Sequence, residues 1–128
     1  MDSNIAKAWL TEMARTANSK DHAAHMKLIS RDVKVFGVPG FEVLGYDDWA
    51  KQCEHEFTHN ILASVSYQGL KVRAMTPRRI MFETVETVAA TDGSRSSQTI
   101  EILIEKEADD IWRVTQERII DSGGGCLK

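Results

Sequence analysis

Two histidines one helical turn apart form the most regular chemical motif in the chain. The stretch 55–59 reads His-Glu-Phe-Thr-His and matches HExxH, in which two imidazoles bind zinc and the glutamate activates water. Cys53 and Phe57 fall on the apolar stripe of the same predicted helix, so His55 and His59 should face away from the core. No downstream segment stands out as the source of a third ligand. We therefore expect an exposed helix face and no bound metal.

A second constellation lies on the last predicted strand, where strict alternation divides the side chains between two faces. One face carries Trp112, Val114, Gln116, Arg118 and Ile120, and the other carries Arg113, Thr115, Glu117 and Ile119. The first face is the more apolar, so we expect it to point inward and to take Gln116 and Arg118 with it. A buried guanidinium needs an anionic ligand or a carboxylate partner. Glu86, on the inner face of an earlier strand, is the expected partner.

These residues predict a pocket for a small molecule. Glu86 and Arg118 are the candidates for a catalytic role, and the predicted ligand-binding residues are Trp9, Met13, Phe36, Trp49, Phe57, Trp112, Gln116 and Arg118. Two other interpretations stay open: Glu86 and Arg118 could form a purely structural ion pair, and the tryptophans could simply fill the core. His22 and His25 lie on a short predicted helix; one of them could flank the mouth of the pocket, but we expect both at the surface.

Composition favours one globular domain over residues 1–121, followed by a flexible glycine-rich tail over 122–128. The net charge is -3 and the only adjacent basic pair is Arg78-Arg79, so we expect no nucleic-acid partner. The chain shows no signal-like start and no apolar run long enough for a membrane span, which predicts a cytoplasmic protein without membrane contact. Cys53 and Cys126 lack a CxxC spacing and should be reduced thiols. No segment predicts a cofactor.

Periodicity predicts helices first and strands afterwards. Helical spacing of apolar residues covers 5–17, 21–29 and 47–60. A strand pair is expected at 33–35 and 41–44 around a Gly-Val-Pro-Gly turn, and four longer strands at 62–75, 79–90, 96–106 and 111–120. The four long strands are separated by turn signals and predict an antiparallel meander.

This order of elements resembles the nuclear transport factor two-like superfamily. The resemblance covers residues 5–120 and rests on four segments in sequence, LISRDVKV at 28–35, GYDDW at 45–49, TDG at 91–93 and IWRV at 111–114. It implies an α+β cone in which a curved, antiparallel or mixed sheet wraps against three helices and leaves a conical pocket. It also implies a homodimer through sheet faces, for which Val65, Tyr67, Val85, Leu103 and Ile119 offer apolar groups.

The superfamily includes ketosteroid isomerases, dehydratases and polyketide cyclases as well as domains without catalysis, so the fold alone does not select a function. The resemblance to ketosteroid isomerases places Gly37 at the position of the base and Met13 near that of the tyrosine. Glu101 could fall near the remaining acid, but alternation with Ile100 and Ile102 should turn it outward. We therefore expect a binding module for a partly apolar molecule with a carboxylate or carbonyl group. An acid–base enzyme of the isomerase, dehydratase or cyclase kind and a homo-oligomeric assembly domain are the alternatives.

Overall fold

The computed structural model describes residues 4–121. Its elements in chain order are α1 (Asn4–Asn18), α2 (His22–Met26), β1 (Ile29–Phe36), α3 (Tyr46–Thr58), β2 (Leu62–Thr76), β3 (Arg79–Ala90), β4 (Arg95–Lys106) and β5 (Trp112–Asp121). The predicted flexible tail at 122–128 lies outside the described residues. Within 4–121, no helix is long and apolar enough to cross a bilayer.

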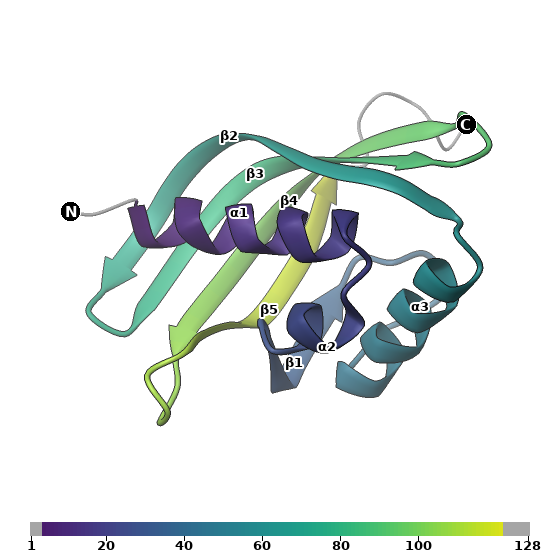
Figure 1. The fold of residues 1–128 in the computed structure, drawn as a ribbon. Helices are drawn as coiled ribbons and strands as arrows, with labels where there is room; N and C mark the ends of the chain where they lie inside the picture. Colours follow the sequence, from purple (N-terminus) through teal and green to yellow (C-terminus); the bar gives the residue numbers. More distant parts are fainter. Residues whose placement is uncertain (1–3, 122–128) are drawn as a thin grey trace.

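All five strands form one mixed sheet in the order β1-β5-β4-β3-β2. β1 runs parallel to β5, and the other neighbours are antiparallel. The sheet is curved, and α1 crosses it on the same side as α2 and α3 (Figure 1). The predicted α+β architecture with three helices against a curved mixed sheet is confirmed.

The chain between β1 and α3 differs from the prediction. Residues 41–44 form no strand, and only an isolated antiparallel bridge joins Leu44 to Val35. Gly37 and Gly40 have φ angles of 92° and 88°, so the backbone turns away twice before a hairpin can extend. β1 is longer than predicted because it begins at Ile29, directly after the five-residue helix α2.

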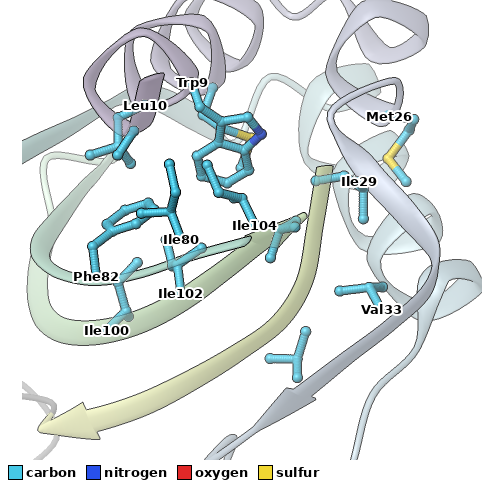
Figure 2. Packing of buried hydrophobic residues seen from close by; sticks show 14 residues of the cluster. Trp9, Leu10, Met26, Ile29, Val33, Ile80, Phe82, Ile100, Ile102 and Ile104 are labelled. Atoms are coloured by element: carbon cyan, nitrogen blue, oxygen red, sulfur yellow. The ribbon is translucent and has the colours of Figure 1, made fainter. Parts of the chain in front are cut away.

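The core lies between α1 and the inner face of the sheet. Trp9 and Leu10 of α1 lie above a layer of side chains from β3 and β4, and Met26, Ile29 and Val33 lie on the other side of the view (Figure 2). The sheet layer is fully or almost fully buried and consists of Ile80, Phe82, Ile100, Ile102 and Ile104. Trp9 and Phe82 meet edge to face, with ring centroids 6.2 Å apart.

A β-bulge in β5 reverses the predicted faces of that strand. Ile104 pairs with Val114, but the preceding Leu103 pairs with Gln116, so Thr115 is an extra residue with no partner in the ladder. Beyond the bulge, Glu117 takes the inward face that strict alternation had given to its neighbours. The prediction that Gln116 and Arg118 point inward is therefore wrong.

Exposure along β5 agrees with this register. Val114 is fully buried and Glu117 is 9% exposed, whereas the side chains of Arg118 and Ile120 are exposed. Ile120 was expected in the core, and its 48% exposure contradicts that expectation. The side chains of β5 thus depart from strict alternation at Thr115, and a second register shift follows between Ile119 and Asp121.

Gly37 makes the close contact that brings the end of β1 against β5. A Cβ atom at this position would lie 2.6 Å from the backbone oxygen of Ile119, and the φ angle of 92° is unfavourable for any other residue. We expect Gly37→Ala to lower the free energy of unfolding in urea by about 2 kcal/mol or more. Gly93→Ala is the control, because Gly93 has a φ of 95° but no atom within 4 Å of the added Cβ. Equal losses in the two variants would contradict the contact with Ile119.

Candidate functional site

A cavity of about 260 Å³ lies between the inner face of the sheet and the three helices. Its walls are mostly apolar and include Met13, Phe57, Leu62, Val65, Val88 and Ile119. Polar side chains reach it from three strands and two helices: Tyr67 of β2, Glu86 of β3, Glu117 of β5, His25 of α2, and Asp48, Gln52 and Glu56 of α3. The volume is close to the lower end of the range of about 300–1,000 Å³ typical of small-molecule pockets.

Strand register aligns Tyr67, Glu86 and Gln98 in a row across the sheet. Tyr67 pairs with Glu86, and Glu86 pairs with Gln98 of β4. The Tyr67 hydroxyl donates a hydrogen bond of 3.1 Å to Oε2 of Glu86, and Nε2 of Gln98 donates one of 3.1 Å to Oε1. The carboxyl group of Glu86 is therefore fixed in position by a donor on each side.

Burial and hydrogen bonding act in opposite directions on Glu86. Burial raises the pKa of its carboxyl group above the ordinary value, and the bonds from Gln98 and Tyr67 partly offset that rise. The pKa of Tyr67 is also raised well above its ordinary value, first by burial and then by the negative charge of Glu86. Tyr67 accordingly keeps its proton and serves as a donor.

Glu117 lies in a different environment from Glu86. Its carboxyl group makes no hydrogen bond with any residue in the described part of the chain, and the side chain lines the cavity. Burial, and after it the neighbouring Glu86, raises the pKa of Glu117 to about 8. On the sheet side of the cavity, Glu117 thus keeps its proton at neutral pH and Glu86 is held by two donors. On the α3 side, Asp48 accepts a hydrogen bond from the backbone N–H of Gly45 and Glu56 accepts one from Nε2 of Gln52.

The helical side of the cavity contributes a neutral imidazole. His25 is 5% exposed, and burial, followed by the nearby His22, lowers its pKa to about 4. Its Nδ1 lies 2.8 Å from the hydroxyl of Thr16. The prediction that His25 lies at the surface is wrong, and His22 is half-buried with its Nε2 2.9 Å from the carbonyl oxygen of Ala50.

The structure brings only part of the predicted ligand-binding set to the cavity. Met13, Trp49 and Phe57 line it, as does the predicted catalytic candidate Glu86. The remaining predicted residues do not line it, and these are Trp9, Phe36, Trp112, Gln116 and Arg118. Trp9 is a core residue, and Trp112 and Phe36 are half-buried elsewhere.

The predicted ion pair between Arg118 and Glu86 does not form within residues 4–121. Arg118 is exposed and stacks on the neighbouring strand instead, with its Cζ 4.7 Å from the centroid of the Phe36 ring. Within the described chain, neither lysine nor arginine lines the cavity. Arg118, the predicted partner of a ligand carboxylate, therefore does not reach the cavity.

Three of the residues predicted for an outer dimer surface line the cavity instead, namely Val65, Tyr67 and Ile119. Ile119 is moved inward by the bulge in β5, and β2 has irregular pairing with β3 at three places. Tyr67 could have been placed from its pairing with Glu86, but strand register is not visible in the sequence alone. The homodimer stays a prediction, with Val85 and Leu103 as the remaining members of its proposed surface.

The HExxH stretch and Cys53 give the site neither zinc ligands nor a nucleophile. His55 and His59 are both exposed, as predicted, and no cluster of three metal-ligating side chains occurs within residues 4–121. Cys53 lines the cavity, but burial, with Glu56 beside it, raises its pKa to about 12. The thiol consequently keeps its proton and is a poor nucleophile at neutral pH.

Solved structures with the same fold identify its class. A nuclear transport factor two-like protein from Cytophaga hutchinsonii superposes with a TM-score of 0.78 at 10% identity over 94% of this chain and 98% of that one. A second, of unknown function, from Shewanella oneidensis gives 0.78 at 14% identity over 94% and 100% of the two chains. A candidate scytalone dehydratase from Novosphingobium aromaticivorans gives 0.71 at 10% identity over 91% and 80%.

The chain therefore has the nuclear transport factor two-like fold that its order of elements predicted. No family model matches the sequence, and no curated protein matches it either. Identities of this size carry information about the fold alone. The activity must be argued from the cavity.

Proposed function

We propose that the protein binds a small, mostly apolar ketone in the cavity and catalyses proton transfer at the carbon next to its carbonyl group. The observation that carries the proposal is the pair of carboxyl groups with different environments in one apolar cavity. Glu117 has a pKa of about 8 and no hydrogen bond within the described chain, whereas Glu86 is held by Tyr67 and Gln98. Environments that separate two titratable groups in this way are typical of an acid and a base acting together.

The roles follow from the two environments. The Glu86 carboxylate removes a proton from the carbon next to the carbonyl, and the protonated Glu117 gives its proton to the carbonyl oxygen. The C–H electron pair forms the carbon–carbon double bond of an enol. Return of a proton at another carbon isomerises the substrate, and loss of a neighbouring hydroxyl as water dehydrates it. The fold likeness to a candidate scytalone dehydratase supports this range of reactions by analogy.

Deuterium exchange provides a test that does not need the natural substrate. We expect the protein to accelerate deuterium uptake from D₂O next to the carbonyl of the probe 2-tetralone, measured by NMR. Glu117→Gln and Glu86→Gln should each reduce the acceleration by about 10²–10⁴-fold, the usual contribution of a general acid or base. The acceleration should also decline above pH 8, because Glu117 then loses the proton that it donates.

Glu101→Gln is the matched control for this experiment. Glu101 lies on β4 between the buried Ile100 and Ile102, which places it on the outer face as predicted, so its variant should exchange deuterium at the wild-type rate. Binding of 2-tetralone without accelerated exchange would instead support a binding module without catalysis. A probe that fails to bind at all would contradict the proposed ligand class. The open cavity argues against a domain that serves assembly alone, since such a role needs no cavity.

A further inference from the structure

The hydroxyl hydrogen of Thr16 determines which nitrogen of the His25 ring carries a proton. The Thr16 hydroxyl lies 2.8 Å from the carbonyl oxygen of Glu12 and 2.8 Å from Nδ1 of His25. Two oxygens at that distance repel each other unless a hydrogen lies between them, so the hydroxyl donates to Glu12. Nδ1 must then carry a hydrogen and donate it to the Thr16 oxygen.

The other ring nitrogen is left as an acceptor. Because Nδ1 carries the hydrogen and the ring is neutral at physiological pH, Nε2 has a free lone pair. The ring lines the cavity, is 95% buried, and has no hydrogen bond from Nε2 to any of residues 4–121. The rings of Trp49 and Phe57 lie beside it, with centroids 6.5 Å and 6.1 Å away. The indole N–H of Trp49 is engaged with the Cys53 thiol, and Phe57 has no donor.

We infer that His25 is a specificity-determining residue, which selects molecules that present a hydroxyl or N–H group to α2 while their carbonyl group meets Glu117 on the sheet. Nε2 opens to the cavity, since it is not among the fully enclosed, unpaired polar atoms of residues 4–121. A ligand that fills the cavity encloses it, so a ligand without a donor leaves the acceptor unpaired at a cost in free energy, and a ligand with a donor avoids that cost. The inference rests on the proposed function for the carbonyl end of the ligand. The substrate class that follows is a small ketone with a hydroxyl or N–H group at the end far from its carbonyl.

The state of the ring can be measured before any ligand is added. In long-range ¹H–¹⁵N NMR spectra of the labelled protein between pH 6 and 8, we expect His25 to carry its proton on Nδ1 and none on Nε2. Thr16→Val removes the hydroxyl that holds Nδ1, and the ring should then populate both tautomers. A His25 ring that carries its proton on Nε2 in the wild-type protein would overturn the inference and leave the roles of Glu86 and Glu117 untouched.

Binding of three probes tests the selection itself. We expect 6-hydroxy-2-tetralone to bind about tenfold more tightly than 6-methoxy-2-tetralone, which has no donor, or unsubstituted 2-tetralone. His25→Phe keeps an aromatic ring but removes the acceptor. Thr16→Val removes the hydroxyl that holds the proton on Nδ1, so Nε2 is an acceptor in only part of the molecules. Both variants should reduce this preference toward unity. The matched control is His22→Phe on the same helix, which should preserve the preference because Nε2 of His22 faces the carbonyl oxygen of Ala50.

Each outcome of the probe experiment has a distinct meaning. Equal dissociation constants for the hydroxy and methoxy probes in the wild-type protein would overturn the selection by His25, whatever the exchange experiment shows. No binding of any of the three probes would overturn the substrate class. A clear hydroxyl preference together with unchanged deuterium exchange in Glu117→Gln would leave the role of His25 standing and would reject the proposed function.

Discussion

Replacing Glu117 with glutamine should stabilise the protein at alkaline pH. The pKa of Glu117 is about 8 in the folded protein against an ordinary value of 4.5, so the folded state keeps a proton that the unfolded state loses between these values. Stability that is fully present below pH 4.5 is consequently lost as the pH rises through 8. A shift of this size corresponds to about 5 kcal/mol. Glutamine keeps the shape and cannot ionise, so Glu117→Gln should gain about 3–5 kcal/mol over wild type at pH 8.5.

Urea denaturation at a series of pH values between 4.5 and 9 measures this gain. The difference between Glu117→Gln and wild type should be small at pH 4.5, grow through neutral pH and level off above pH 8. Glu101→Gln makes the same chemical change on the outer face of the neighbouring strand and should follow the wild-type curve. Parallel curves for Glu117→Gln and wild type would show that the carboxyl group is not held in its acid form. A large gain would also mean that the protein maintains this acid at the expense of stability, as functional groups often require.

Phe82→Ala should destabilise the protein more than any surface substitution. Phe82 is completely buried on the central part of the sheet and packs edge to face on Trp9 of α1. Truncation removes this contact and leaves a cavity between helix and sheet that the surrounding isoleucines cannot fill. We expect a loss of about 3–5 kcal/mol in the free energy of unfolding, measured by urea denaturation at pH 6.

Phe41→Ala is the control, because it removes the same side chain at an exposed position. Phe41 is 59% exposed, so the same substitution there should change the free energy of unfolding by no more than about 0.5 kcal/mol. Phe82→Leu retains most of the apolar volume and should lose less than Phe82→Ala, which keeps the comparison informative even where the alanine variant is largely unfolded. A Phe82→Ala variant as stable as Phe41→Ala would contradict the packing of α1 on the sheet.

The order of elements could be predicted because each long element has a clear period in the sequence. β3 runs from Arg79 to Ala90 as predicted, and its unbroken register with β4 places Glu86 on the predicted inner face. The strand expected at 41–44 fails because a turn signal between two short apolar runs does not specify pairing. Positive φ angles at Gly37 and Gly40 direct the chain away from the sheet instead.

The composition of the cavity was harder to predict because it depends on single residues that change register. Thr115 has no unusual sequence feature, yet as the bulge residue it exchanges the faces of β5 and replaces Arg118 by Glu117 in the cavity. His25 was missed for another reason. α2 has only five residues, which is too short for an apolar stripe to show which side is buried.

The bulge at Thr115 also makes the chemistry of the cavity depend on one extra residue in the strand. Regular pairing with Thr115 retained would place Gln116 and Arg118 on the inner face, and the guanidinium beside Glu86 would suit anions rather than neutral ketones. Deleting Thr115 would instead leave Gln116 directly after Val114, so that the ladder becomes regular while Glu117 and Ile119 keep the inner face. Two binding chemistries thus differ by one residue of register, and an alignment of homologues that omits a gap here would equate residues from opposite faces of the sheet.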